Sequence, residues 1–275
     1  MIKDLAVHLT GSDEDQVRLN HAAALAGRLG AHVTGLHVNV LPEVLGLTEA
    51  AGSAYLDALL REGNAQATRV DALLRPKMAA LGVANELRRL DVFPSEAGNM
   101  LAREVRLSDL FIGTRPYGDP GGMAHIEESV LFRSARPCLF LPPKVDVPAR
   151  YDTVFVAWNQ SRESARAIAD ALPILKLAKT VVVGLAEDGT PAEARGEAPG
   201  ADVGRYLSRH GIGADISMIE GWGDEAAALL NEARRLAADL VVMGGYGHSR
   251  FREFVLGGAT RHMLDHADVP VMMSH

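Results

Sequence analysis

The chain has 275 residues, a formal net charge of −7 at pH 7 and a sequence pI near 5.8. Hydrophobic residues make up 48% of it and charged residues 23%, which is typical of a globular protein with a substantial core and room for one large domain or two ordinary ones. The acidic balance argues against a nucleic-acid surface, because such a surface requires a basic face.

The single cysteine, Cys138, excludes an internal disulfide framework and fits a reducing compartment. It follows Pro137 at the start of an apolar run, so we interpret it as a buried structural thiol rather than a nucleophile. No apolar stretch reaches the length needed to span a bilayer, and the first residues show no signal-peptide pattern. We therefore expect a cytoplasmic protein that does not contact a membrane.

Apolar runs and helical periodicity alternate along the chain. In the first half, strands are expected near 3–9, 32–39, 84–90, 109–113 and 137–141, and helices near 14–29, 54–81, 95–106 and 125–134. In the second half, strands are expected near 152–158, 179–186, 213–220, 239–243 and 269–274, and helices near 161–177, 201–210, 224–237 and 258–267. This alternation predicts, in each half, a parallel sheet with helices on both faces.

The two halves repeat one another, which indicates a tandem duplication. The matching landmarks, in the same order in both halves, are 4–13 with 152–161, 31–38 with 179–186, 108–113 with 238–243, and 136–141 with 269–273. The segment 142–149 contains three prolines and suits a semi-rigid linker between the halves. We therefore predict an N-terminal domain at 1–143 and a C-terminal domain at 150–275.

The most informative motif follows the apolar run that ends at Met243. Gly244, Gly245 and Gly247 form a turn there, and the pair at 257–258 opens the next helix. A strand, a glycine turn and a helix start together expose backbone N–H groups that can hold a phosphate. The chain contains no Gly-Lys-Ser/Thr sequence, so a P-loop is not supported.

The predicted phosphate site uses mainly backbone donors. They are the N–H groups of Gly247, His248, Gly258 and Ala259, joined by the hydroxyls of Ser249 and Thr260. Arg250 either adds positive charge to this site or is a solvated side chain on a loop; the sequence leaves both readings open.

The spacing of Gly244, Gly247 and Gly257 resembles the nucleotide-binding motif of the universal stress protein family, and Gly-His-Ser-Arg at 247–250 and Gly-Gly-Ala-Thr at 257–260 strengthen the resemblance. The resemblance covers nearly the whole chain. It implies two doubly wound α/β domains, each with a five-stranded parallel sheet of order 3-2-1-4-5. It also implies an internal pseudo-dimer in which the last strands of the two halves pair.

The resemblance further implies a site for ATP or another adenine nucleotide in the C-terminal domain, with magnesium entering only with the nucleotide. Gly258 departs from the family pattern, in which Ser or Thr is usual, and Asn159 stands where family members that hold nucleotide have an Asp. The N-terminal site is predicted to be degenerate, because Pro116 and Pro120 remove backbone donors. The implied nucleotide-binding residues are Ala157, Trp158, Asn159, Leu185, Ala186, Met243, Gly244, Gly247, His248, Ser249, Arg250, Gly257, Gly258, Ala259 and Thr260.

The sequence shows no catalytic constellation. His262 and His266 share a helix face, but we interpret them as ordinary helix histidines rather than metal ligands. We expect a nucleotide-dependent stress-response sensor with at most weak ATPase activity, which forms a homodimer and binds an unidentified protein partner. Two alternatives remain: a nucleotide-free interaction protein, favoured by Gly258 and Asn159, and a slow ATP hydrolase, which the missing catalytic groups disfavour.

Overall fold

The computed structural model describes residues 1–42, 49–117, 124–144, 149–186, 198–219, 225–245 and 258–275. The chain forms two compact units, and each is described here by itself. The N-terminal unit comprises 2–114 and 123–136, and the C-terminal unit comprises Met1, 115–122 and 137–275. These units are not simply the two sequence repeats, because 115–122 and the strand at 138–141 belong to the C-terminal unit.

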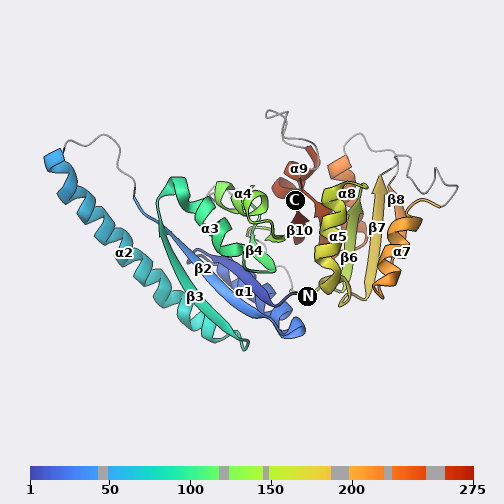
Figure 1. Ribbon diagram of the computed structural model, residues 1–275, viewed down its shortest axis with the longest axis horizontal. Helices are drawn as coiled ribbons and strands as arrows, with labels where there is room; N and C mark the ends of the chain where they lie inside the picture. The colour runs from blue at the N-terminus through green and yellow to red at the C-terminus, as the bar shows by residue number, and fades with distance from the viewer. Residues whose placement is uncertain (43–48, 118–123, 145–148, 187–197, 220–224, 246–257) are drawn as a thin grey trace. The chain divides into compact units, whose positions relative to one another are not determined.

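The N-terminal unit contains a parallel sheet of order β3-β2-β1-β4. Its elements are β1 (Asp4–Leu9), α1 (Glu14–Leu29), β2 (His32–Val40), α2 (Glu49–Ala79), β3 (Asn85–Val92), the 3-10 turn η1 (Pro94–Glu96), α3 (Ala97–Val105), β4 (Leu110–Thr114) and α4 (Ala124–Arg133). Helices pack on both faces of the sheet: Met78 of α2 lies against Gly35, whereas Leu36 on the other face lines a pocket with Glu104 of α3 (Figure 1).

The C-terminal unit contains a six-stranded sheet of order β8-β7-β6-β9-β10-β5. Its elements are β5 (Cys138–Leu141), β6 (Thr153–Trp158), α5 (Arg162–Leu175), β7 (Thr180–Ala186), α7 (Ala201–Arg209), β8 (Asp215–Ile219), α8 (Glu225–Arg235), β9 (Leu240–Gly244), α9 (Gly258–His266) and β10 (Val271–Ser274). The five strands of the second repeat are parallel and follow the order 3-2-1-4-5. The last strand of the first repeat, β5, is antiparallel to β10.

The strand predictions are confirmed in both repeats. Continuous apolar runs form central strands such as β4 and β9, which are buried on both faces, whereas the edge strands β3 and β8 are more exposed. Helix limits differ more. Helix α2 starts at Glu49 rather than near residue 54. The segment predicted as one helix at 95–106 begins as a 3-10 turn at Pro94 before α3, since a proline at the first position suits a helix start.

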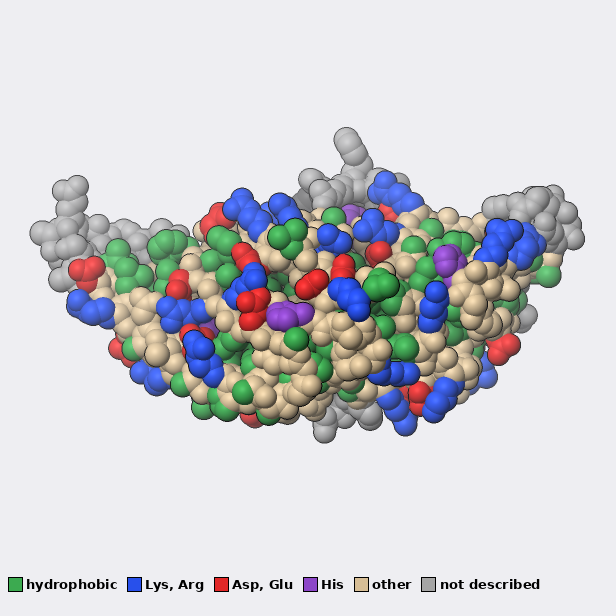
Figure 2. Space-filling model, turned by 60° about the horizontal axis from the view of Figure 1, so that its bottom comes forward, with side chains coloured by type: hydrophobic (Ala, Val, Ile, Leu, Met, Phe, Trp, Pro, Cys, Tyr) green, Lys and Arg blue, Asp and Glu red, His purple; other side chains and the backbone are tan. Residues whose placement is uncertain are grey.

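The buried core includes large aromatic side chains in both units, among them Phe111 and Phe155. Cys138 is also fully buried, and burial raises the pKa of its thiol, which fits the structural role predicted for it. Among the described residues, no helix is both long enough and apolar enough to cross a membrane. On the face shown in Figure 2, acidic and basic side chains are interspersed.

Candidate functional site at the carboxyl edge of the C-terminal sheet

Three neighbouring strands of the C-terminal unit end at the same edge of the sheet. Strand β6 lies between β7 and β9, and all three run parallel, with Trp158 opposite Leu185 and Val156 opposite Val242. The sheet therefore brings together the residues that follow β6, the end of β7 and the start of the glycine motif at Gly244. This is the edge at which doubly wound proteins bind ligands.

Asn159 forms the turn that leads from β6 into α5. Its Oδ1 accepts hydrogen bonds from the backbone N–H of Ser161 at 3.3 Å and from the Ser161 hydroxyl at 2.8 Å. The Ser161 hydroxyl oxygen in turn accepts from the N–H of Ser164 at 3.1 Å and caps the helix. Asn159 is exposed, and no described residue accepts a hydrogen bond from its Nδ2. The amide NH₂ group can therefore donate to a ligand, which an Asp carboxylate could not do.

Gly244 has a packing role that the sequence analysis missed. A Cβ atom built at this position would lie 2.5 Å from the backbone nitrogen of Ser164 and 2.6 Å from the carbonyl carbon of Glu163. The end of β9 therefore contacts the first turn of α5 backbone to backbone. The first glycine of the motif is required for this close approach, whatever the ligand.

The residues at the end of β10 contact the neighbouring part of this edge. The N–H of Gly245 donates to the carbonyl of Ser274 at 2.8 Å, and the ring Nδ1 of His275 lies 3.0 Å from the carbonyl of Gly245. Glu163 is nearly fully buried nearby. Burial would raise the pKa of its carboxyl, but hydrogen bonds from Arg162 and from its own backbone, with the charges of Arg162 and His275, hold that pKa below its ordinary value.

Neither Glu163 nor His275 was singled out from the sequence. These two residues come together because the residues after β10 lie next to α5. Residues that are so far apart in the sequence leave no local pattern by which their contact could be predicted. Glu163 could have been noticed only as an acidic residue in the first turn of a helix, which is a common feature.

The other predicted residues fall into three groups. Ala157, Leu185, Met243 and Thr260 have buried side chains, so Ala157, Leu185 and Met243 would meet a ligand mainly through their backbone groups, whereas Trp158 is half-buried. Ala186 lies in β7, and Gly258 and Ala259 lie in α9. The remaining residues lie outside the part of the chain that the structure describes; they are Gly247, His248, Ser249, Arg250 and Gly257.

The corresponding edge of the N-terminal unit is organised differently. After β1, the buried carboxylate of Asp15 accepts hydrogen bonds from the N–H groups of Thr10 at 3.0 Å and Gly11 at 2.7 Å. Arg18, 2% exposed, pairs with Asp15 at 2.9 Å and donates to the Thr10 hydroxyl at 3.0 Å. Burial lowers the pKa of Arg18, although the nearby carboxylates oppose this effect.

Two further contacts fill the same edge. A Cβ atom at Gly11 would lie 2.8 Å from Cγ1 of Val70, so α2 lies directly over the turn. Next to it, Nδ1 of His8 lies 2.8 Å from Oε1 of Glu127, and both side chains are buried. Side chains of the protein itself thus use the polar groups of this edge, and the degenerate N-terminal site stays a prediction.

A metal site has no support among the described residues, which contain no group of three or more His, Cys, Asp or Glu side chains placed to hold an ion. The rings of His262 and His266 stack on one another with centroids 4.3 Å apart. The ring Nδ1 of His266 lies 3.1 Å from the carbonyl of His262, as in an ordinary helix contact.

Fold and site geometry define a tandem, doubly wound α/β protein in which the Asn159 turn and Gly244 lie at the same carboxyl edge of the second repeat. The model of the universal stress protein family matches residues 150–275. Universal stress protein Slr1230 of Synechocystis sp. is 23% identical over 98% of this chain and 99% of its own length. Residues 150–275 therefore match the universal stress protein family, as the glycine spacing indicated, and the similarity to Slr1230 extends over nearly the whole chain.

Solved structures agree with this fold. A universal stress protein from Archaeoglobus fulgidus superposes with a TM-score of 0.75 at 17% identity, and the match covers 98% of this chain and 97% of that one. A putative universal stress protein from Pseudomonas aeruginosa gives a TM-score of 0.63 at 19% identity, over 99% of this chain and 93% of that one. At these identities the likeness shows the fold alone.

Proposed function

We propose that the protein is a stress-response sensor that binds an adenine nucleotide, ATP in the first instance, at the carboxyl edge of its C-terminal sheet. The observation that carries this proposal is the convergence of the Asn159 turn with the start of the glycine motif at Gly244 on adjacent parallel strands. The unused Nδ2 donor of Asn159 would contact the nucleoside, and the motif's backbone N–H groups would hold the phosphates.

The proposed mechanism is occupancy sensing rather than catalysis. A ligand that binds one arrangement of the glycine motif more tightly shifts the population toward it and changes the surface offered to a protein partner or to a second copy of the chain. Any magnesium would enter with the nucleotide. ATP hydrolysis, if present, would be slow, because neither the motif nor the described residues supply a group that positions a water.

A nucleotide-free interaction protein is the second candidate, favoured by Gly258 and Asn159. Denaturing the purified protein and analysing the supernatant by absorbance and mass spectrometry separates the two candidates. We expect an adenine nucleotide in the supernatant, and ATP binding by calorimetry after it is removed. A protein that carries no nucleotide and binds none would favour the second candidate.

Valine at Gly247 or Gly257 should abolish ATP binding, because a side chain would fill the space of a phosphate. Gly213→Val is the matched control: Gly213 is exposed, and an added Cβ there meets nothing within 4 Å. Calorimetry should show wild-type ATP affinity for the control and none for the two motif variants. Undiminished binding in those variants would reject the site, and steady ATP turnover that both of them lose would instead identify a hydrolase.

A further inference from the structure

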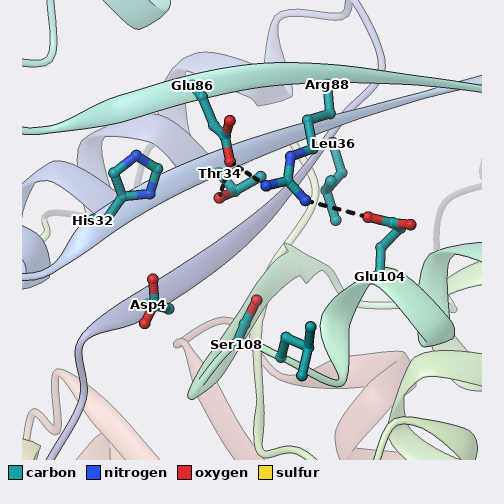
Figure 3. Close-up of a pocket in the computed structure, with 9 residues that line it drawn as sticks. Asp4, His32, Thr34, Leu36, Glu86, Arg88, Glu104 and Ser108 are labelled. Carbon is teal, nitrogen blue, oxygen red and sulfur yellow. Dashed lines mark hydrogen bonds and ion pairs between the residues drawn. The ribbon is translucent and has the colours of Figure 1, made fainter.

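The N-terminal unit contains a pocket of about 430 Å³ at the amino ends of its strands, away from the carboxyl edge where doubly wound sheets ordinarily bind ligands. Asp4 and His32 open β1 and β2, and Glu86 lies at the start of β3. The pocket is completed by the end of α3 and the turn after it (Figure 3). Its lining residues are Asp4, His32, Thr34, Leu36, Glu86, Arg88, Glu104, Leu107 and Ser108.

The lining carries more negative than positive charge. Arg88, the only arginine among the described lining residues, bonds Glu86 at 2.5 Å and lies 3.5 Å from Glu104 (Figure 3). One guanidinium therefore compensates one of three carboxylates, and Asp4 lies on the other side of the pocket in Figure 3. An anion is disfavoured here because Arg88 is already engaged by two carboxylates.

Besides the excess of negative charge, the hydroxyl of Ser108 also points to a ligand. The residue is 8% exposed, and its hydroxyl points into the pocket in Figure 3. Within the described part of the chain, no residue forms a hydrogen bond with this hydroxyl. The hydroxyl oxygen is open to the pocket rather than fully buried, so it can accept a hydrogen bond from a donor that enters the pocket.

Apolar surface lies between the charged groups. Leu36 is 1% exposed at the pocket, whereas Leu107 on the turn after α3 is 90% exposed. An aliphatic segment that contacts both would remove mainly the exposed surface of Leu107 from water. The pocket thus combines separated carboxylates, an unused hydroxyl acceptor and apolar contacts.

We propose that this pocket binds a small aliphatic diamine. One ammonium group lies near Asp4 and donates to the Ser108 hydroxyl, the other lies beside Glu104, and the methylene chain contacts Leu36 and Leu107. An ammonium has three donors and no acceptor, which suits carboxylates and a serine oxygen. A single metal ion fits less well, because among the described residues these carboxylates are not grouped closely enough to bind one.

The probe is 1,4-diaminobutane, titrated into the full-length protein by calorimetry, with 1,4-butanediol as the uncharged control ligand. We expect saturable binding of the diamine that weakens as salt is raised, and no binding of the diol. Asp4→Asn and Glu104→Gln should each weaken binding about fivefold or more, because each removes one partly screened charge. Ser108→Ala should also weaken it.

Glu62→Gln controls for the loss of one negative charge outside the pocket, because Glu62 is exposed on α2 and does not line the pocket. The diamine affinity of this variant should equal that of the wild type. Circular dichroism of each variant verifies that it is folded. The proposal is overturned if the diamine does not bind at millimolar concentration, if the diol binds equally well, or if magnesium chloride binds and the diamine does not. If Glu62→Gln weakened diamine binding as much as the pocket variants do, the proposal would also be overturned. The diamine would then be attracted by the acidic protein in general and not by this pocket.

Discussion

Gly244 belongs to a predicted ligand-binding motif and is also needed for packing. Its spacing from Gly247 and Gly257 marks a phosphate-binding motif, yet the structure gives it a packing reason: a side chain would meet the backbone of Glu163 and Ser164. Sequence analysis found the glycine because a spaced motif is local. It missed the contact with α5 because that contact joins residues 80 positions apart in the chain, which no local pattern encodes.

Gly244→Ala should lower the free energy of unfolding by about 1–3 kcal/mol, because the methyl group must displace backbone rather than a flexible side chain. Urea unfolding followed by circular dichroism measures the change. Gly204→Ala is the control: Gly204 lies in α7, and an added Cβ there meets nothing within 4 Å, so alanine should be neutral or stabilising. Equal stability of the two variants would show that β9 and α5 can separate at little cost.

Asn159 shows how little the residue type alone says about the role of a single side chain. The sequence indicated only that an amide replaces a carboxylate. The structure adds that Oδ1 is used by the turn at Ser161, so that the NH₂ group is the part directed to other partners. Which half of an amide is used depends on the turn that follows it, and residue type alone does not determine this.

At the scale of elements, the turn from β1 into α1 contains a buried network of the protein's own charged side chains. Asp15 binds the backbone N–H groups of Thr10 and Gly11, and Arg18 compensates its charge. The strands and helices themselves could be predicted, because helical periodicity and apolar runs are patterns of residues that are close in the sequence. This buried network could not, since His8 and Glu127 are 119 residues apart and meet only through the fold.

Arg18→Met should destabilise the protein by about 3 kcal/mol or more, because it leaves the buried carboxylate of Asp15 without its partner. Removing both charges, in the Arg18→Met, Asp15→Asn double variant, should cost less than the sum of the two single changes. Urea unfolding of the four proteins measures this coupling. Arg69→Met is the control, since Arg69 is exposed on α2 and bonds only Gln66 of the same helix among the described residues. If the effects of the Arg18 and Asp15 changes on the free energy of unfolding were strictly additive, the two residues would not be coupled and the network would be contradicted.

At the scale of the whole molecule, the two sequence repeats are not independent compact units. The first repeat contributes β5 to the sheet of the C-terminal unit, where it pairs with β10. The pairing of the two last strands was expected from the resemblance to the universal stress protein family, and β5 and β10 do pair. The assignment of 115–122 to the C-terminal unit was not, because its contacts, such as Arg115 donating to the carbonyl of Leu264 at 2.9 Å, cross 149 positions of sequence.

This strand exchange predicts how fragments behave. Residues 150–275 alone would leave one edge of β10 unpaired, and Val271–Ser274 is a fully buried strand in the full chain. An exposed apolar edge strand is a template for pairing with another copy. We expect this fragment to self-associate through β10. The fragment 137–275 retains β5 and keeps β10 covered, so it should associate less, and then only through the β5 edge whose Leu141 carbonyl accepts from the N–H of Arg115 in the intact protein.

Size-exclusion chromatography with light scattering, at matched concentrations, compares the two fragments directly. The longer fragment with Phe140→Pro is the control, because proline removes a backbone donor from β5 while leaving the added length. It should associate like residues 150–275. If the shorter fragment is as monomeric as the longer one, β5 does not protect β10, and the last strand of the first repeat is dispensable for the C-terminal unit.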